Sequence, residues 1–339
     1  MKVVVPEIMN DSVIISRVRL ARNLTGAPFY IDNPVLARDI ISKVDRALKL
    51  VEPLKLYKTA DLTALELEAL KERHLISNAL IENKLCGAVL ISEDESLSVM
   101  VNEEDVLREQ CFLEGFSLYE AYKRIQIIDD ELNKNLNIAF DEKFGFLTAC
   151  PTNLGTGLRA SVMMFLPALT EGGKIKSLIK EMKKLGLTVR GIYGEGSEAE
   201  GFIYQISNEV TLGVSEYQII EEVSNTVEKI LLAEKDEMER LYTGKNELSL
   251  IDKVWRSFGI LTHAVLLEYG EFLKHISWVK LGAMLNVIPI KETYKLDRLI
   301  ISVRPANLCV KQGKRLTSTE RDLLRAKIVA EKLKRLRGF

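Results

Sequence analysis

The segment CPTNLGTGLRASVMMF (150–165) places two glycines between a cysteine–proline pair and an arginine that begins a run of small and apolar residues. The glycines favour a tight loop close to a phosphate, and the run after them favours a β-strand. A P-loop carries a lysine directly after its last glycine, and this segment has none. If the loop meets a nucleotide, another source of positive charge must neutralise the phosphates.

Strand-like and helix-like segments alternate around this loop. We predict strands at 138–150, 159–165, 188–193 and 202–212, and a hairpin over 86–102 with the acidic turn SEDES. We predict helices at 34–50, 117–136 and 174–186. Many of the strands lie too close together in the sequence for a crossover helix between each pair. We therefore expect an α+β fold with a mostly antiparallel sheet flanked by helices.

The pattern changes near residue 215. Ser215 and Gln218 have the spacing of a capping box, and apolar residues follow at helical intervals. Helical patterns then dominate to the C-terminus, with breaks at 243–246, near Pro289 and at 312–314. The sequence thus predicts two domains, an α+β domain over 1–235 and an all-helical C-terminal domain over 236–339.

The composition is that of a soluble globular protein, with 47% hydrophobic and 28% charged residues and a net charge of −1. We expect neither membrane association nor direct binding of nucleic acid, although 311–339 contains ten Lys and Arg against three Asp and Glu. The four cysteines form no CxxC pair, and Pro6 interrupts the first apolar run. We therefore expect no structural zinc, no disulfides, no signal peptide and a cytoplasmic location.

Arginines recur in four short motifs, SRVRLAR (16–22), NEEDVLR (102–108), GLRAS (157–161) and VRGIYGE (189–195). Each arginine alone is typical of a solvated surface. Together they are able to form a cage around a triphosphate, because the planar guanidinium binds phosphate oxygens in pairs and keeps its charge. Phosphoryl transfer depends mainly on such positioning and charge neutralisation.

These four motifs, in this order, resemble the phosphagen kinases, a family of ATP-dependent guanidino kinases. The stretches SRVRLARNL, RGIYGEGSEAEGFIYQISNEVTLG and ERDLLRA (320–326) are most similar to its bacterial protein arginine kinase branch. The resemblance implies a phosphagen-kinase-like catalytic domain followed by a helical domain for dimerisation and phosphoarginine sensing. It also implies phosphorylation of arginine side chains in proteins.

The resemblance further implies an ATP site with Mg²⁺ held mainly by phosphates and water, and no metal site made by the protein. The implied nucleotide residues, with the backbone of 159–163 and 190–195 wrapping the nucleotide, are Ile15, Ser16, Arg17, Val18, Arg19, His74, Arg108, Arg159, Ala160, Ser161, Val162, Met163, Arg190, Gly191, Ile192, Tyr193, Gly194 and Glu195. We call Arg17, Arg19, Arg108, Arg159 and Arg190 the arginine cage. The assignment of His74 depends almost wholly on the resemblance, since a lone histidine is more often structural.

The resemblance assigns catalytic roles to Glu104, Glu195 and Cys150. Two carboxylates suit a guanidinium, because they accept its N–H groups and one can take a proton as transfer proceeds. Cys150 either supports the guanidinium as a thiol of lowered pKa or is a small buried thiol. Two positions depart from the family pattern: Ile15 stands where serine is common, and Val106 where histidine is frequent.

The late ERDLLRA motif implies an allosteric phosphoarginine site made by Arg321, Asp322, Arg325 and Ala326. Thr317 and Glu320 have capping-box spacing, which places Arg321 and Arg325 one turn apart on one helix face. Two arginines can bind the phosphate while the acid binds the cation. An ordinary salt-bridged helix surface has the same pattern.

We therefore expect a protein arginine kinase linked to stress response and regulated proteolysis. The resemblance implies protein substrates with exposed arginines, a zinc-binding activator protein, an Hsp100-type unfoldase, a stress-gene repressor and a homodimer. Two alternatives stay open, a kinase of free arginine and a catalytically silent phosphoarginine-binding regulator. The intact Glu104 and the five arginines argue against the silent regulator.

Overall fold

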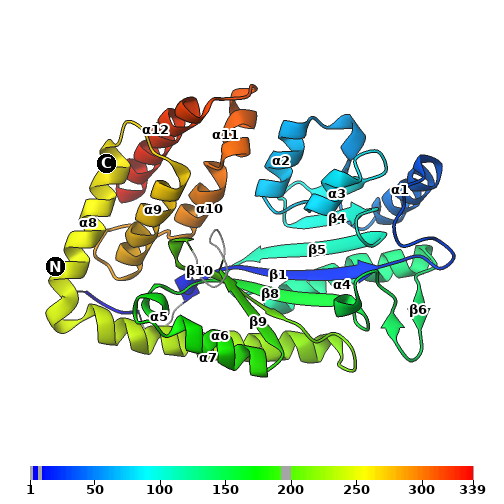
Figure 1. Cartoon of the computed structure of the whole chain (residues 1–339), viewed down its shortest axis with the longest axis horizontal. Coiled ribbons are helices and arrows are strands. Elements are labelled where there is room, and N and C mark those ends of the chain that lie inside the picture. Colours follow the sequence, from blue (N-terminus) through cyan, green and yellow to red (C-terminus); the bar gives the residue numbers. More distant parts are fainter. Residues whose placement is uncertain (1–2, 7–9, 192–199, 339) are drawn as a thin grey trace.

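The computed structural model describes residues 3–6, 10–191 and 200–338. Its centre is an eight-stranded sheet of order β2-β3-β4-β5-β1-β8-β10-β9, in which every neighbouring pair is antiparallel (Figure 1). The strands are β1 Val13–Arg22, β2 Leu54–Lys58, β3 Ala88–Ser92, β4 Leu97–Val101, β5 Leu107–Glu114, β8 Leu158–Phe165, β9 Leu187–Gly191 and β10 Ile203–Asn208. The expected α+β fold is confirmed.

Helices cover both faces of this sheet. One face packs its apolar residues, such as Val18, Leu20 and Val162, into a core shared with α1 Pro34–Leu48, α4 Leu118–Asn135, α6 Ile175–Lys184 and α7 Glu216–Tyr242. On the other face, α2 Ala64–Glu72 and α3 Asn78–Glu82 share a smaller core with buried residues of β3 and β4, and Tyr57 of β2 and Phe112 of β5 pack against it. The remainder of that second face, over β1, β5 and β8, is where the polar residues described below lie.

The C-terminal region is helical and has its own core. Its helices are α8 Glu247–His263, α9 Tyr269–Met284, α10 Tyr294–Ser302, α11 Pro305–Gln312 and α12 Ser318–Arg337. This core also includes Phe165 and Ile203 from the sheet, so the helices pack directly on the end of β8 and the start of β10. The shorter helices of the described chain are α5 Pro167–Glu171 and the 3₁₀ turns Asn10–Ser12, Thr59–Asp61, Pro151–Asn153, Glu200–Phe202 and Gly244–Asn246.

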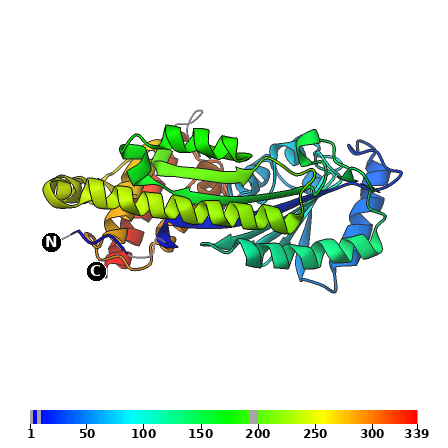
Figure 2. The ribbon, with the colours of Figure 1, turned by 90° about the horizontal axis from the view of Figure 1, so that it is seen from below.

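Helix α7 is 27 residues long and begins at the expected capping box of Ser215 and Gln218. Figure 2 shows it running beneath the sheet and on to the C-terminal helices. Its first half buries Val223 and Val227 in the sheet core, and its second half buries Met238 and Tyr242 in the helical core. The expected domain boundary at 235/236 lies inside this continuous helix.

The predicted strand over 138–150 is wrong. The segment forms only the short hairpin of β6 Phe140–Asp141 and β7 Gly145–Phe146, outside the main sheet. The Asp141 carboxylate accepts hydrogen bonds from the backbone N–H groups of Lys143 and Phe144, and Gly145 has a φ of +73°. This side-chain-supported turn interrupts the extended backbone after two residues.

Two further features of the described residues complete the fold. All four cysteines are free thiols. None of the helices within these residues has the length and apolar character needed to cross a membrane.

Candidate active site

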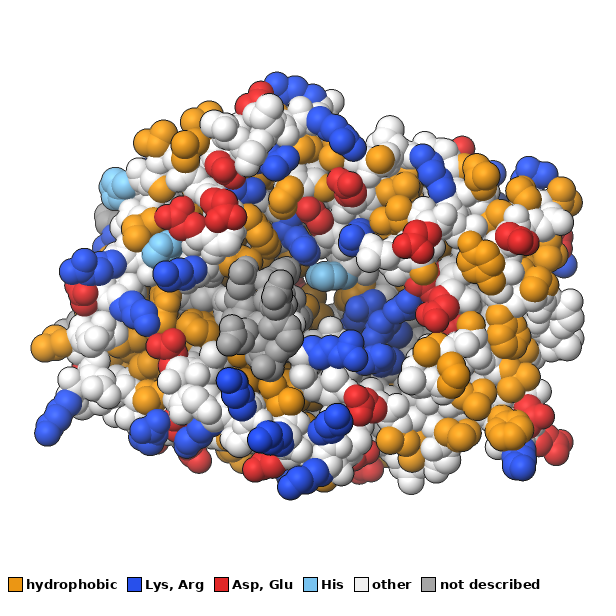
Figure 3. Space-filling model, in the orientation of Figure 1, with side chains coloured by type: hydrophobic (Ala, Val, Ile, Leu, Met, Phe, Trp, Pro, Cys, Tyr) orange, Lys and Arg blue, Asp and Glu red, His pale blue; other side chains and the backbone are white. Residues whose placement is uncertain are grey.

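The register of the sheet brings the arginine cage onto one face. Arg17 and Arg19 alternate on β1, Arg159 on β8 pairs with Arg19, and Arg108 on β5 pairs with Ala21. Residues that pair across antiparallel strands share a face, and so do residues two apart. Arg190 on β9 pairs with Gln205, and the same rules place it on this face too. Figure 3 shows a dense group of Lys and Arg side chains in a hollow near the centre of this face.

The cage carries a local excess of positive charge. Burial, and then the charges of Arg108 and Arg159, lower the pKa of Arg17 to about 9. Burial and the charges of Arg17 and Arg108 also lower the pKa of Arg19. The Nε atoms of Arg17, Arg19 and Arg159 are buried and have no hydrogen-bond partner within the described part of the chain. Unmatched donors and mutual repulsion are both relieved by a bound polyanion.

His74 lies beside the cage because of an unusual backbone conformation. Helix α2 ends at Glu72, and His74 has a φ of +63°. Its carbonyl accepts a hydrogen bond of 3.3 Å from Gln110 Nε2, which fixes the turn against β5. Burial, and then the charges of Arg17 and Arg304, lower the pKa of His74 to about 4. The imidazole is therefore neutral at physiological pH, and its Nε2 is buried without a partner among the described residues.

The NEED segment forms a tight loop between β4 and β5. Its backbone turns at Asn102, which has a φ of +60°. The buried Glu103 carboxylate accepts from the Glu104 N–H at 2.8 Å and forms an ion pair with Arg108. Asp105 accepts from the Asn23 side chain and from the Ala149 N–H, both at 2.6 Å. The flanking acids thus fix the loop and leave the Glu104 side chain exposed to ligand.

Two adjoining pockets follow from this arrangement. The acidic pocket, of about 130 Å³, is lined by Glu104 and Cys150 with three cage arginines, namely Arg19, Arg108 and Arg159. The histidine pocket, of about 500 Å³, is lined by His74 and Arg304 with Arg17, Arg19 and Arg108. Arg19 and Arg108 line both pockets. The two pockets therefore meet at these two arginines, with Glu104 lining one and His74 lining the other.

Partial burial, and then the charges of Glu103 and Asp105, raise the pKa of Glu104. A carboxylate with a raised pKa is a better proton acceptor, so its position next to the cage suits a base. Cys150 lies on the same pocket, and its Sγ is 3.0 Å from Thr152 Oγ1. The hydrogen bond from Ala149 to Asp105 joins the cysteine loop to the NEED loop.

The glycines of the 150–162 segment serve packing. A Cβ on Gly155, whose φ is +108°, would lie 2.4 Å from the Thr211 carbonyl oxygen. A Cβ on Gly157 would lie 2.6 Å from both the Ala21 oxygen and Arg22 Nη1. Their small size lets the loop approach β1 and the segment after β10, and Gly157 also lines the acidic pocket.

Several residues expected at the nucleotide have side chains that point away from the arginine face, and the backbone contacts predicted for 159–163 stay a prediction. Val18, Ala160 and Val162 point into the core on the opposite face. Ser16 is buried on that face as well, where its hydroxyl donates to the Gly115 carbonyl at 2.8 Å. Three expected residues share the arginine face, namely Ile15, Ser161 and Met163, and of these Ile15 lines a separate groove toward α10. Gly191 pairs with Tyr204, which the register places on the opposite face. Ile192, Tyr193, Gly194 and Glu195 lie outside the described residues.

Residues that the sequence analysis missed include Glu103, Asp105, Gln110 and Arg304. The NEED motif contains three adjacent acids, so its two flanking carboxylates were visible in the sequence as candidates for supporting roles. No sequence motif indicated a role for Arg304, because only the packing of the C-terminal helices brings it to the pocket.

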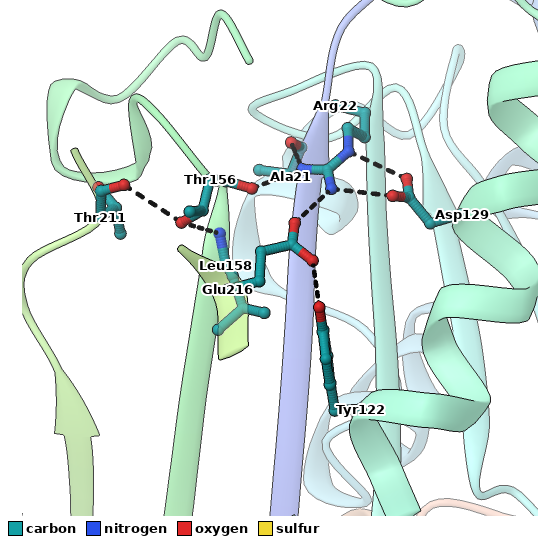
Figure 4. Close-up of polar contacts among 8 residues, drawn as sticks. All are labelled: Ala21, Arg22, Tyr122, Asp129, Thr156, Leu158, Thr211 and Glu216. Carbon is teal, nitrogen blue, oxygen red and sulfur yellow. Dashed lines mark hydrogen bonds and ion pairs between the residues drawn. The ribbon is translucent and has the colours of Figure 1, made fainter. Parts of the chain in front are cut away.

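Arg22, the third arginine of SRVRLAR, belongs to a separate buried network behind the cage (Figure 4). Its Nε and Nη2 donate to the Asp129 carboxylate at 3.0 and 2.9 Å, and Nη1 donates to the Thr156 carbonyl at 2.9 Å. Nη2 also reaches Glu216 at 3.2 Å, and Glu216 accepts from the Tyr122 hydroxyl at 2.9 Å. Arg22 therefore ties β1 to the glycine loop, α4 and α7.

The ERDLLRA motif (320–326) lies on α12, where the predicted capping box of Thr317 and Glu320 is present. Arg325 is buried: its Nε donates to the Val303 carbonyl at 3.0 Å and its Nη1 to the Leu267 carbonyl at 2.7 Å. Nη1 also pairs with Asp322 at 2.6 Å, while Arg321 donates to the Leu316 carbonyl. Arg325 thus connects the C-terminal end of α10 to the loop before α9, in contrast to a solvated helix surface.

The comparisons with known proteins identify the family. The family model described as "ATP:guanido phosphotransferase, C-terminal catalytic domain" matches 37–237, and that described as "Protein-arginine kinase McsB C-terminal domain" matches 247–338. A protein-arginine kinase of Caldanaerobacter subterraneus subsp. tengcongensis is 43% identical over 95% of this chain and 97% of the relative. The chain belongs to the protein-arginine kinase family. A protein-arginine kinase of Clostridium tetani is 41% identical, with 96% of each chain covered.

Solved structures of guanidino kinases share the fold of this kinase. The duplicated taurocyamine kinase of Schistosoma mansoni, with bound transition-state-analogue components, has a TM-score of 0.61 and 25% identity over 75% of this chain and 40% of that chain. A lombricine kinase has a TM-score of 0.57 and 22% identity over 73% of this chain and 75% of that chain. This kinase is an ATP-dependent phosphotransferase of the same fold.

Proposed function

We propose that this kinase transfers the γ-phosphate of ATP to the guanidinium of arginine side chains in proteins, using the arginine cage and Glu104. The observation that carries the proposal is the overlap of the two pockets at Arg19 and Arg108, with Glu104 at one end and His74 at the other. The cage supplies fixed positive charge where phosphoryl transfer develops charge on oxygen. Its buried and unpartnered Nε atoms fit phosphate oxygens.

In the proposed reaction, the acceptor guanidinium enters the acidic pocket beside Glu104. One guanidinium N–H proton passes to the Glu104 carboxylate, that nitrogen forms a bond to the γ-phosphorus, and the bond to the bridging β–γ oxygen breaks to leave ADP. Arg159 and Arg108 stabilise the transferring phosphoryl oxygens. Cys150 lies near enough to support the acceptor, and Glu195 is the proposed second carboxylate on the strength of the resemblance alone.

We propose that Mg²⁺ enters with the nucleotide and is held mainly by phosphates and water. In the described parts of the chain, no group of three or more histidine, cysteine, aspartate or glutamate side chains is arranged to hold a metal ion. The positive cage fits the phosphate side of such a complex. When bound, Mg²⁺ would neutralise charge on the β- and γ-phosphates.

The named relatives and the C-terminal family model favour a protein acceptor over free arginine. The fold shared with kinases named for small guanidino compounds makes free arginine the second candidate. To separate the two, the kinase is incubated with Mg-ATP and either an unfolded protein or free arginine, followed by mass spectrometry without acid. Phosphoarginine in the protein supports the proposal, and acid-labile phosphate confined to free arginine overturns it. Glu104→Gln is the inactive control.

We also propose the wider roles that the resemblance implies. These are a cytoplasmic homodimer with catalytic and helical domains that divide near 235, linked to stress response and proteolysis. Its proposed partners are a zinc-binding activator, an Hsp100-type unfoldase and a stress-gene repressor. The proposed phosphoarginine site is Arg321, Asp322, Arg325 and Ala326. Since Arg325 already pairs with Asp322, a phosphate bound there must compete with that carboxylate.

A further inference from the structure

Arg304 comes from the C-terminal helical region but lines the histidine pocket together with Arg17, Arg19 and His74. It is the residue immediately before α11, next to Pro305. We propose that Arg304 is a nucleotide-binding residue, which contacts the phosphate nearest the nucleoside and adds a sixth guanidinium to the cage. This inference rests on the proposed function, because it assumes that ATP lies across the two pockets.

The position of Arg304 is fixed from two sides. Its Nη1 donates to the Glu72 carbonyl at 3.0 Å, and the Glu72 carboxylate accepts from the N–H groups of Ala306 and Asn307 at 3.0 and 2.9 Å. These bonds cap the first turn of α11 with the last residue of α2. His74 follows Glu72 by two residues, so one junction places both His74 and Arg304. Figure 1 shows α11 beside α2 at this junction.

The charge of Arg304 acts inside the pocket. It contributes with Arg17 to the lowered pKa of His74, which places its guanidinium within electrostatic reach of the imidazole. The acids that line this pocket are Glu68 and Glu72, and both Glu72 oxygens already accept backbone hydrogen bonds from α11. Four arginines and a neutral histidine thus face two acids in this pocket. An anionic group is the ligand that this lining favours.

The choice of phosphate follows from the geometry of the two pockets. The transferred phosphoryl group must lie near Glu104 in the acidic pocket, whereas Arg304 lines only the histidine pocket. Arg19 and Arg108, which line both, then hold the middle of the triphosphate. This order leaves Arg304 for the phosphate attached to the nucleoside.

The C-terminal region also supports the backbone just before Arg304. Buried Arg325 on α12 donates from Nε to the Val303 carbonyl at 3.0 Å. The helical region therefore contributes both the guanidinium and the contact that holds its backbone. The nucleotide site is incomplete without this region.

The test is a comparison of nucleotide affinity in the full chain. We expect Arg304→Ala to raise the Kd of ATP, ADP and AMP by about 10-fold, the size of one charge-assisted hydrogen bond. The Kd of adenosine should stay unchanged, because adenosine has no phosphate. Arg298→Ala is the matched control, since Arg298 lies on α10 of the same region, is exposed and pairs with Glu114 outside the pocket. Isothermal titration calorimetry measures each Kd.

The outcomes separate this inference from the proposed function. Arg304→Gln is measured in parallel with thermal unfolding, so that affinity is read from a variant that folds. Unchanged affinity for all three nucleotides in a folded variant overturns the role of Arg304, and so does an equal loss for adenosine. A wild-type kinase that binds ATP but phosphorylates no protein would instead overturn the proposed function. An affinity loss for AMP in Arg304→Gln, absent in Arg298→Ala, supports the inference.

Discussion

Replacing Arg17 by methionine should stabilise the nucleotide-free kinase while weakening its binding of ATP. Arg17 is held among Arg108 and Arg159, with its Nε buried and unpartnered within the described residues. Methionine keeps most of the apolar stem and removes the charge, together with the contact of the guanidinium with the Phe112 ring. We thus expect this one substitution to weaken ATP binding and to raise the free energy of unfolding.

The magnitude follows from the lowered pKa of Arg17. A fall from 12.5 to about 9 sets an upper limit of about 5 kcal/mol on the folding penalty. Because the charged form is the disfavoured one, the penalty is fully present below pH 9 and declines only above it. The Arg17 side chain is half-buried and water screens part of the repulsion, so we take about 1 to 2 kcal/mol. For a chain of 339 residues this raises Tm by about 1.5 to 3 °C.

Thermal unfolding at pH 7.5, with and without Mg-ATP, measures both effects. ATP at 100 times its Kd should stabilise the wild-type kinase by about 2.7 kcal/mol. It should stabilise Arg17→Met far less. Arg22→Met is the matched control on the same strand, because its guanidinium is buried against Asp129 and Glu216. That variant should lose about 3 to 5 kcal/mol through uncompensated carboxylates.

The reasoning depends on the two arginines having opposite effects. If Arg17→Met lowers Tm to the same extent as Arg22→Met, the cage is not under electrostatic strain and the argument from repulsion is refuted. If the variant keeps the full stabilisation by Mg-ATP, Arg17 does not bind the nucleotide.

Three other predictions follow from the site. Glu104→Gln should lower kcat by about 10²- to 10⁴-fold with little change in the Kd of ATP, and an unchanged kcat would exclude it as the base. Because the pKa of Glu104 is raised, the acidic limb of the pH profile of kcat/KM should lie above pH 4.5. Glu103→Gln removes one of the neighbouring negative charges that raise this pKa, so it should shift the limb to lower pH. A shift to higher pH would contradict the role of the Glu103 charge. Gly155→Ala should cost roughly 1 to 3 kcal/mol of unfolding free energy, since its Cβ meets the Thr211 carbonyl, whereas Gly173→Ala, with open space around it, should cost less.

Local sequence patterns predicted most of the fold. The hairpin over 86–102 and the capping box of Ser215 depend on neighbours in the sequence, so both were predictable. The segment 138–150 failed because the Asp141 side chain supports a turn that overrides its strand-like composition.

The features that could not be predicted depend on contacts between distant residues. Nothing near Arg304 in the sequence indicates that it lies beside His74, since the packing of α11 on α2 brings them together. The packing role of the glycine loop was unpredictable for a similar reason, because Gly155 and Gly157 meet Thr211 and Arg22 only after the chain has folded. The sequence motifs indicated which arginines form the cage, whereas the sheet register showed that they share a face and their burial showed that their charges repel.

Helix α7 has a consequence for how this protein can be divided or recombined. The same helix contributes Val227 to one core and Met238 to the other, without an intervening linker. A polypeptide that stops between the two matched family segments would leave α7 with an apolar stripe facing water. A chimera that exchanges the catalytic or the helical region between relatives must therefore keep α7 intact. We expect the two regions to be inherited together and to unfold together.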